Sequence, residues 1–418
     1  MRGKTGLVLS GGGARGAYEV GVLQYIYEEF GRHARFDILS GSSVGAINAG
    51  FAAAASNDPA HEIASLVKVW SNLRLWDELH YGIGQLLRLP LLVFGRIPII
   101  GNGMTRIALG HSLFDVRHLV EVVRTGVPWE RIQDNLKEGH FESLAITATE
   151  ILSGTSTTFV ETSRMQLPPW TRDSRHKAEK TVITSAHALA SSAIPLLFPL
   201  VGIDGRAFCD GGMRQNTPIG PTLRLGADRL LVIRLKTSKH HRPLLFPFDT
   251  EQPPPSFLIG KLFNALFLDQ LDYDLDRLDR INQILEDGEE TFGPDFAERL
   301  AQTAIRHRGQ QWRKVHLKVI APSDDLGAIA AEVIREPSFR KGMPLVWRFI
   351  MRYLDSGRRE EADLLSYLLF DGHYCRRLMD LGYRDGKNAR DDLARFFEGA
   401  EKARVIEPSA GDLTAGGT

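Results

Sequence analysis

The first part of the chain shows two successive patterns of apolar and polar positions. A short apolar run at 5–10 (TGLVLS) ends in three glycines. In the segment 14–30 the apolar residues then return at helical spacing, with Ala17, Val20 and Leu23 on one face. Short apolar runs that end in glycine are typical of buried strands, and the 3.6-residue period is typical of an amphipathic helix. The pattern therefore predicts a strand, a glycine turn and a helix.

The same two patterns recur along the rest of the chain. Short apolar or β-branched runs predict strands at 35–40, 227–235 and 314–322, and a strand pair within 142–161. A tight turn that enters a helix is predicted within 41–55, and helices are predicted at 180–195, 339–357, 359–383 and 389–405. Strands that alternate with helices indicate an α/β sandwich with a largely parallel sheet.

Two apolar stretches do not fit this alternation. The segment 86–103 is broken by Pro90 and Pro98, and the segment 242–271 begins rich in proline and continues as an amphipathic helix. Apolar residues with spaced arginines are typical of segments that lie on a membrane, although plain core packing explains them as well. The candidate residues for membrane or acyl-chain contact are Leu91, Leu92, Phe94, Phe257 and Leu262.

Composition narrows the class of protein. The 418 residues are 43% hydrophobic and 24% charged, and Lys+Arg and Asp+Glu are both 51, so no net charge attracts nucleic acid. Two cysteines do not indicate a disulfide scaffold or a structural zinc site. We see no signal peptide and no apolar run of about 18 residues, the length a spanning helix needs. We expect a cytoplasmic protein, or one peripheral on a membrane.

The glycine turn has three possible interpretations. Gly11, Gly13 and Gly16 satisfy G-x-G-x-x-G, and Asp37 follows at the spacing of a ribose-binding acid in dinucleotide folds. However, Asp37 lies at the start of its predicted strand, and the ribose-binding acid is normally at the end. The turn could also hold an oxyanion during a reaction, or be purely structural.

A second motif favours the oxyanion interpretation. The segment GSSVG, from Gly41 to Gly45, fits G-x-S-x-G with Ser43 at its centre, between a predicted strand and a predicted helix. That context is typical of a nucleophile elbow, in which the helix amino terminus helps to hold negative charge beside the serine. The alternative is an ordinary helix cap.

A nucleophilic serine needs a base, and an aspartate is the most interesting candidate. None of the 13 histidines stands in a recognisable motif. Asp210 ends a short apolar run and is followed by Gly211 and Gly212, which allow a sharp turn. An aspartate in an apolar site has its pKa raised by desolvation, which makes it a better proton acceptor. Alone, the segment would be read as a plain Asp-Gly turn.

Four segments together resemble the patatin-like phospholipase family of lipid acyl hydrolases. They are GGGARG (11–16), GSSVGAINAG (41–50), ASSAIPLLFP (190–199) and DGGMRQNTPI (210–219), in the order of the family. The resemblance implies a three-layer α/β/α sandwich with a largely parallel central sheet, followed here by a C-terminal helical region that lies outside the motifs.

The resemblance also implies the roles of individual residues. Ser43 would be the nucleophile and Asp210 the general base, without a histidine. The oxyanion hole would be formed by the backbone N–H groups of Gly11, Gly12 and Gly13, with Arg15 nearby. It implies no cofactor, no metal and calcium independence.

We therefore expect a phospholipase A or lysophospholipase-type hydrolase with a phospholipid or lysophospholipid substrate and peripheral membrane contact. Two alternatives are a non-enzymatic membrane-associated scaffold and an NAD(P)-binding oxidoreductase. The expected organisation is a catalytic domain at 1–330 with its motifs within 5–235, a helical region at 331–408 and a disordered tail at 409–418. Head-group preference and oligomeric state are left open.

Overall fold

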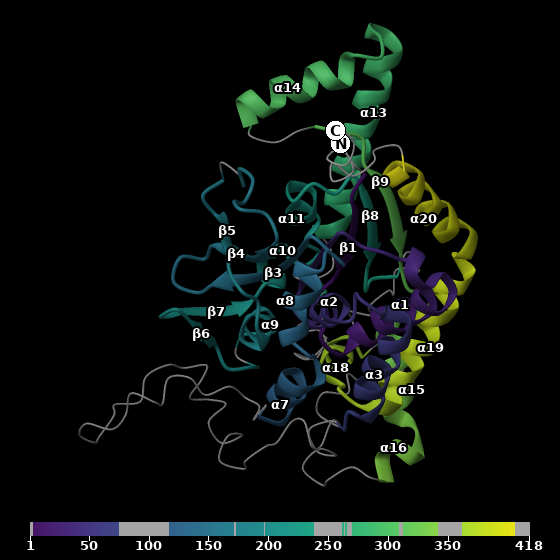
Figure 1. Cartoon of the computed structure of the whole chain (residues 1–418). Coiled ribbons are helices and arrows are strands. Elements are labelled where there is room, and N and C mark those ends of the chain that lie inside the picture. Colours follow the sequence, from purple (N-terminus) through teal and green to yellow (C-terminus); the bar gives the residue numbers. More distant parts are fainter. Residues whose placement is uncertain are drawn as a thin grey trace, which may run out of the picture.

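A mixed sheet flanked by helices forms the centre of the molecule (Figure 1). The computed structural model describes residues 3–74, 117–170, 173–195, 197–237, 261–262, 264–265, 270–308, 312–341 and 362–405. The strands of these residues are β1 (Thr5–Leu9), β2 (Ile38–Ser42), β3 (Ser143–Glu150), β4 (Ser156–Thr162), β5 (His176–Lys180), β6 (Val201–Ile203), β7 (Arg206–Asp210), β8 (Arg229–Ile233) and β9 (His316–Ile320).

The strand order brings the chain segments of interest to one edge of the sheet. The order is β5-β4-β3-β2-β1-β8-β9, and β7 pairs with β3 and β6. Because β1, β2 and β3 are parallel neighbours, their carboxyl ends lie at the same edge. Strand β7 runs antiparallel to β3 and places Asp210 opposite Ala148, near that edge. The residues after β1, after β2 and at the end of β7 therefore meet.

Alternate residues of the central strands face two different helical layers. In β1, Leu7 and Leu9 belong to one buried cluster with α1, whereas Val8 belongs to a second cluster with Leu271 and Leu278 of α13. Side chains of a strand point to opposite faces, so helices cover the sheet on both sides. The predicted three-layer α/β/α sandwich with a largely parallel sheet is confirmed.

The described helices have the following bounds. They are the 3₁₀-helices η1 (Gly13–Gly16) and η2 (Gly31–His33), and the α-helices α1 (Ala17–Phe30), α2 (Val44–Ala54), α3 (Pro59–Asn72), α7 (Arg117–Gly126), α8 (Glu130–Lys137), α9 (Ser185–Ser191), α10 (Gly212–Gln215), α11 (Ile219–Arg224), α13 (Gln270–Phe292), α14 (Phe296–Arg308), α15 (Leu326–Arg335), α16 (Pro337–Lys341), α18 (Asp363–Leu368), α19 (Gly372–Asn388) and α20 (Arg390–Val405).

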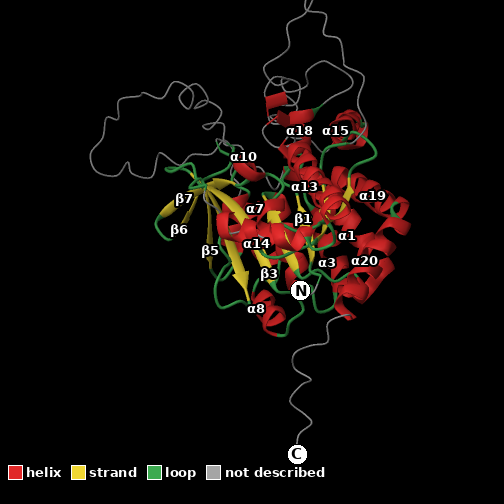
Figure 2. Ribbon diagram, turned by 90° about the horizontal axis from the view of Figure 1, so that it is seen from above, coloured by secondary structure: helices red, strands yellow, loops and turns green. Residues whose placement is uncertain are grey.

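The C-terminal helices pack onto the N-terminal part of the chain. Helix α19 lies beside α1 in both ribbon views (Figures 1 and 2). The Tyr18 hydroxyl donates to Asp385 at 3.0 Å, and the rings of Tyr25 and Tyr383 meet edge to face with centroids 5.4 Å apart. Since Tyr18 and Tyr25 belong to α1, the C-terminal region completes the core on this side of the sheet.

Two predicted helices have wrong boundaries. The helix expected at 180–195 is shorter, because Lys180 ends β5 and α9 begins only at Ser185. The helix expected at 359–383 is divided into α18 and α19 by Leu369, Phe370 and Asp371. The Asp371 side chain accepts from the backbone N–H of His373 and so caps α19 as a new helix.

Candidate active site

Ser43 stands in a sharp turn between β2 and α2. Its backbone has φ 53° and ψ −130°, a conformation that costs a non-glycine residue about 1–3 kcal/mol. The flanking glycines are required by close packing: a Cβ on Gly41 would lie 2.1 Å from the Gly45 carbonyl oxygen, and one on Gly45 would lie 2.5 Å from the Leu9 carbonyl oxygen. The G-x-S-x-G spacing therefore has a steric basis, and the turn presents Ser43 at the sheet edge.

Asp210 lies directly against this serine. The Ser43 hydroxyl donates to Asp210 Oδ2 at 2.7 Å, and the backbone N–H of Gly212 donates to Oδ1 at 2.7 Å. Asp210 is fully buried, and its burial raises the pKa of the carboxyl to about 7, although both hydrogen bonds act to lower it. A carboxylate with a near-neutral pKa can accept a proton from Ser43 around neutral pH.

Ser191 holds the elbow and the aspartate together. Its hydroxyl accepts from the backbone N–H of Ser43 at 2.8 Å and donates to the carbonyl of Thr147 at 2.6 Å. Its own carbonyl accepts from the N–H of Gly211, the residue after Asp210. The sequence contained Ser191 only as one letter of the segment 190–199, with no local pattern that indicated this role.

The glycine turn follows β1 and lies beside Ser43. The N–H of Gly11 donates to the Asn216 carbonyl at 3.0 Å, and the Asn216 side-chain amide donates back to the Gly11 carbonyl at 3.0 Å. The Gly11 amide is therefore already engaged. Within the described ranges, the amides of Gly12 and Gly13 have no acceptor, which leaves these two as candidate donors to a bound anion.

A buried carboxyl group supports the start of this turn. Glu19 of α1 accepts from the backbone N–H of Ser10 at 2.7 Å and from the side-chain amide of Asn48 at 2.9 Å. Burial raises the pKa of Glu19 to about 8, against the effect of both hydrogen bonds. Glu19 thus ties α1 and α2 to the end of β1, where the turn begins.

The Arg15 side chain is directed toward helix α18. Its side chain is 4% exposed, and its guanidinium group contacts Asp363 at 3.1 Å and donates from Nε to the Ser366 hydroxyl at 2.7 Å. Both partners belong to α18. The side chain of this predicted oxyanion-site residue therefore faces the C-terminal region.

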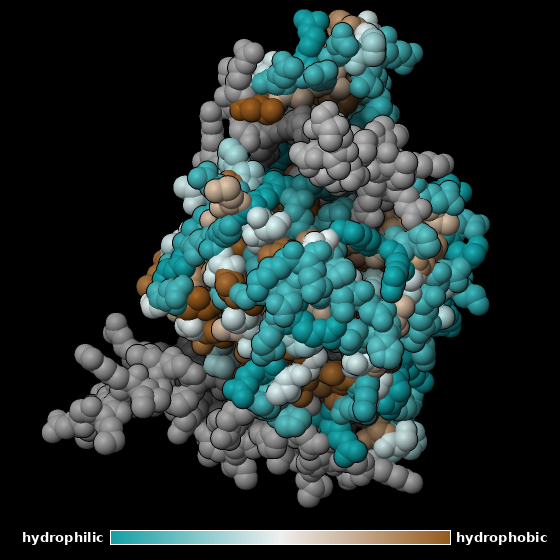
Figure 3. Space-filling model, in the orientation of Figure 1, coloured by the Kyte–Doolittle hydropathy of each residue, from teal (hydrophilic) through white to brown (hydrophobic). Residues whose placement is uncertain are grey.

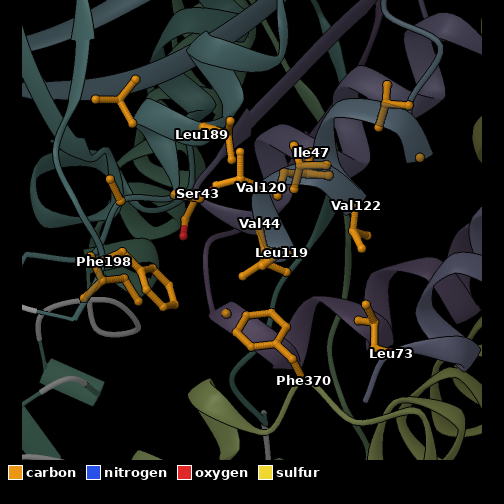
Figure 4. A pocket seen from close by; sticks show the side chains of 18 of the residues that line it. Ser43, Val44, Ile47, Leu73, Leu119, Val120, Val122, Leu189, Phe198 and Phe370 are labelled. Atoms are coloured by element: carbon orange, nitrogen blue, oxygen red, sulfur yellow. The ribbon is translucent and has the colours of Figure 1, made fainter. Parts of the chain in front are cut away.

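An apolar cavity of about 360 Å³ opens beside Ser43. Figure 4 shows the Ser43 oxygen directed into this space, with Phe198 and Phe370 on either side of it. Its walls come from α2, α3, α7 and the segments around 189–202 and Phe370, and they are almost entirely apolar. Such a cavity suits a hydrocarbon chain better than a polar molecule.

A comparison with protein-family models matches residues 7–223, more than half of the chain, to the family described as patatin-like phospholipase. The chain belongs to this family. The matched range contains the glycine turn, Ser43, Ser191 and Asp210, and it ends before α13 and all the later helices.

Several solved structures are distantly similar to this patatin-like chain. VipD from Legionella pneumophila is 12% identical, with 91% of this chain and 67% of its own covered and a TM-score of 0.30. Human GIVD cytosolic phospholipase A2, in complex with methyl γ-linolenyl fluorophosphonate, is 11% identical, with 97% and 60% covered and a TM-score of 0.37. ExoU from Pseudomonas aeruginosa, in complex with SpcU, is 17% identical, with 96% and 78% covered and a TM-score of 0.27. The chain spans only part of these proteins, and its family membership rests on the family match.

The dinucleotide interpretation of the glycine turn does not fit this patatin-like chain. Asp37 precedes β2 and accepts from the backbone N–H of Thr5, at the amino edge of the sheet. The glycine turn lies at the carboxyl edge, about 15 Å away along a five-residue strand. Asp37 therefore cannot bind a ribose held at the turn.

The remaining candidate residues are those predicted for membrane or acyl-chain contact. Leu91, Leu92, Phe94 and Phe257 fall outside the described residues, as does the predicted tail at 409–418. Leu262 is described and is 55% exposed.

The described residues contain neither a membrane-spanning helix nor a cluster of metal-ligating side chains. None of the helices that can be described combines the length and apolar character needed to cross a bilayer. The face in Figure 3 is mostly hydrophilic, with apolar residues in a few small groups. In the same ranges no three or more His, Cys, Asp or Glu side chains gather as a metal site would require.

Proposed function

We propose that this protein hydrolyses carboxylic esters of phospholipids or lysophospholipids, with Ser43 as nucleophile and Asp210 as general base. The observation that carries the proposal is the 2.7 Å hydrogen bond from Ser43 Oγ to Asp210 Oδ2, formed at the wall of an apolar cavity. Membership of the patatin-like phospholipase family supports a lipid acyl hydrolase activity.

In the acylation step, Ser43 Oγ attacks the carbonyl carbon of the ester while its proton moves to Asp210 Oδ2. The carbonyl oxygen becomes an oxyanion, which accepts hydrogen bonds from the Gly12 and Gly13 amides. Each such donor is typically worth about 3–4 kcal/mol in the transition state. When the carbonyl re-forms, the bond to the alcohol breaks, and Asp210 returns its proton to the leaving oxygen. The acyl group is then bound to Ser43.

In the deacylation step, Asp210 takes a proton from water, which attacks the acyl carbon of the intermediate. The same two amides hold the second oxyanion, and its collapse releases the fatty acid and returns the proton to Ser43. The cavity supports this sequence because its apolar walls can hold the acyl chain beside Ser43 and keep bulk water away. Delivery of such a substrate requires peripheral contact with a lipid surface.

The first test compares the wild type with Ser43→Ala and Asp210→Asn, using a fluorophosphonate probe and a p-nitrophenyl acyl ester, with and without EDTA. We expect labelling and turnover in the wild type, no labelling of Ser43→Ala, and a kcat at least about 100-fold lower for Asp210→Asn. EDTA should change neither rate.

Two matched variants test whether the loss of activity is specific to Ser43 and Asp210, because each removes a serine or an aspartate elsewhere in the chain. Ser56→Ala removes a hydroxyl just after α2 that does not line the cavity and that donates to the Ala53 carbonyl instead of Asp210. Asp204→Asn changes an exposed aspartate in the turn between β6 and β7. Both should keep wild-type labelling. Labelling of Ser43→Ala, or a folded wild type that stays inactive on soluble esters and on phosphatidylcholine and lysophosphatidylcholine vesicles, would contradict the proposal.

A further inference from the structure

Helix α18 from the C-terminal region lies directly against the glycine turn. A Cβ built on Gly13 would lie 2.2 Å from the carbonyl oxygen of Tyr367, and Gly13 has φ +58°. A side chain at this position would be both strained and in collision with the backbone of α18. The backbone of the turn therefore packs directly against the backbone of α18. This contact is at Gly13, whose amide is one of the two candidate donors to the oxyanion.

Arg15 joins the two elements through its side chain. It lies in η1, two residues after Gly13, and its backbone N–H bonds the Gly12 carbonyl at 3.2 Å. Its guanidinium group reaches three residues of α18: it contacts Asp363 at 3.1 Å, donates to Ser366 at 2.7 Å, and stacks over the ring of Tyr367 with 4.2 Å to the centroid. Because each of these contacts requires a specific geometry, together they fix the orientation of the buried guanidinium group.

The partners on α18 are themselves fixed. Asp363 Oδ2 accepts from Lys261 at 2.9 Å, while its Oδ1 accepts from Arg15. Burial alone would raise the pKa of Asp363, but the charges of Arg15 and Lys261 hold it below its ordinary value, so the group stays ionised. The Tyr367 hydroxyl donates to Asn264 at 2.9 Å. Lys261 and Asn264 thus hold the α18 side of the link.

The same segment also reaches the cavity. Phe370, two residues after the end of α18, lines the cavity together with Gly13 and Ser43 (Figure 4). Residues 363–370 therefore contact the proposed oxyanion site and the proposed acyl site at once, although they lie more than a hundred positions beyond the range matched to the family.

We propose that Asp363 and Ser366 are positioning residues, which act through Arg15 to hold the Gly12 and Gly13 amides in the conformation that binds the oxyanion. This inference rests on the function proposed above. It makes the C-terminal region a required part of the hydrolase site. It also gives Arg15 a role that differs from direct contact with the oxyanion.

The test measures kcat and KM for a soluble p-nitrophenyl ester, together with the rate of fluorophosphonate labelling, in Asp363→Asn and Ser366→Ala. A misplacement of about 1 Å in catalytic donors can lower a rate about 100-fold, so we expect kcat and the labelling rate to fall about 10- to 100-fold. KM should stay within about twofold, because the acyl cavity is unchanged.

Asp385→Asn is the matched control. It weakens another buried contact between the C-terminal region and α1, since Asp385 accepts from Tyr18 and from the N–H of Ser323. It does not touch the glycine turn, so its melting temperature should fall while its kcat stays within about twofold of the wild type. All rates are measured well below the melting temperature of each variant.

The double variant Arg15→Met/Asp363→Leu separates positioning from stability. It replaces the buried ion pair by apolar side chains, which is often neutral or stabilising for the fold. Asp363→Asn should have a lowered melting temperature, because it leaves the charge of Arg15 without its ionised partner. We expect the double variant to have a higher melting temperature than Asp363→Asn, while its kcat stays low. A kcat that recovers together with the melting temperature would show a purely structural link and overturn the inference.

Ser366→Ala decides the question if the double variant does not fold, because it removes only one hydroxyl. An active wild type whose Ser366→Ala and Asp363→Asn variants keep kcat within about twofold would refute this inference alone. A folded wild type without labelling or turnover would instead refute the proposed function.

Discussion

Replacing Asp210 by asparagine is expected to make the protein more stable at alkaline pH. Burial raises the pKa of this carboxyl from 3.8 to about 7 in the folded state. Between these two values the folded protein holds a proton that the unfolded chain has already lost. The stability that the protonated form contributes is fully present below pH 3.8, and it is lost as the pH rises through 7.

The size of the effect follows from the interval between the two pKa values. Each pH unit well within it removes about 1.4 kcal/mol from the wild-type free energy of unfolding, and the loss levels off above the folded-state pKa, so about 3 kcal/mol is lost between pH 5 and pH 8. The asparagine variant does not titrate. Its amide has one oxygen for two donors, the Ser43 hydroxyl and the Gly212 N–H, which costs about 1 kcal/mol. It should be about 1 kcal/mol less stable at pH 5 and about 2 kcal/mol more stable at pH 8.

Urea unfolding of both proteins at pH 5, 6, 7 and 8 measures this difference. Glu19 is a second buried carboxyl with a raised pKa, about 8, and it also weakens the fold as the pH rises. Because both proteins retain Glu19, its contribution cancels in the comparison. A difference that stays constant from pH 5 to pH 8 would refute a near-neutral pKa for Asp210, and with it the physical reason for assigning it as the base.

Three further outcomes follow from the geometry of the site. The wild-type kcat/KM should rise with pH through an apparent pKa of about 7, because Asp210 must be deprotonated to accept the Ser43 proton; a pH–rate profile that is flat from pH 5 to 9 would argue against this. Ser43→Gly should be about 1–2 kcal/mol more stable than Ser43→Ala in thermal unfolding, since only glycine relieves the strain of φ 53°, and equal stabilities would show that the turn is not strained. Ser191→Ala should lose about 1–3 kcal/mol and most of kcat, because the Ser43 N–H and the Thr147 carbonyl lose a buried partner; unchanged kcat would remove Ser191 from the support of the elbow.

The elements around Ser43 could be predicted because their signals are local. Strand β1, the glycine turn and α1 follow one another within 30 residues, and each has a distinct spacing of apolar positions. The elbow could also be predicted from a local signal, because its own backbone geometry requires the small residues around Ser43. By contrast, Ser43 and Asp210 are 167 positions apart, and no periodicity relates them. Only the family resemblance joined them before the structure did.

Helix boundaries were less predictable where local and tertiary requirements compete. Thr181 and Val182 continue the apolar pattern of the following helix, but β-branched residues also suit the extended chain that leaves β5. Residues 359–383 read as one helix by composition, whereas Asp371 and Gly372 start a new one. This start had a recognisable signal, an N-cap aspartate, which the apolar pattern on both sides concealed.

From its contacts with the N-terminal part of the chain, we propose that the C-terminal helical region folds together with the catalytic domain. The expected boundary at 330 separates Arg15 from Asp363 and Tyr18 from Asp385, yet both pairs are hydrogen-bonded inside the structure. If the matched range were cut out alone, Arg15 would keep its charge and lose its buried partners, which strongly destabilises a fold. The motifs of the family lie early in the chain, and we propose that the geometry of the glycine turn depends on residues near its end.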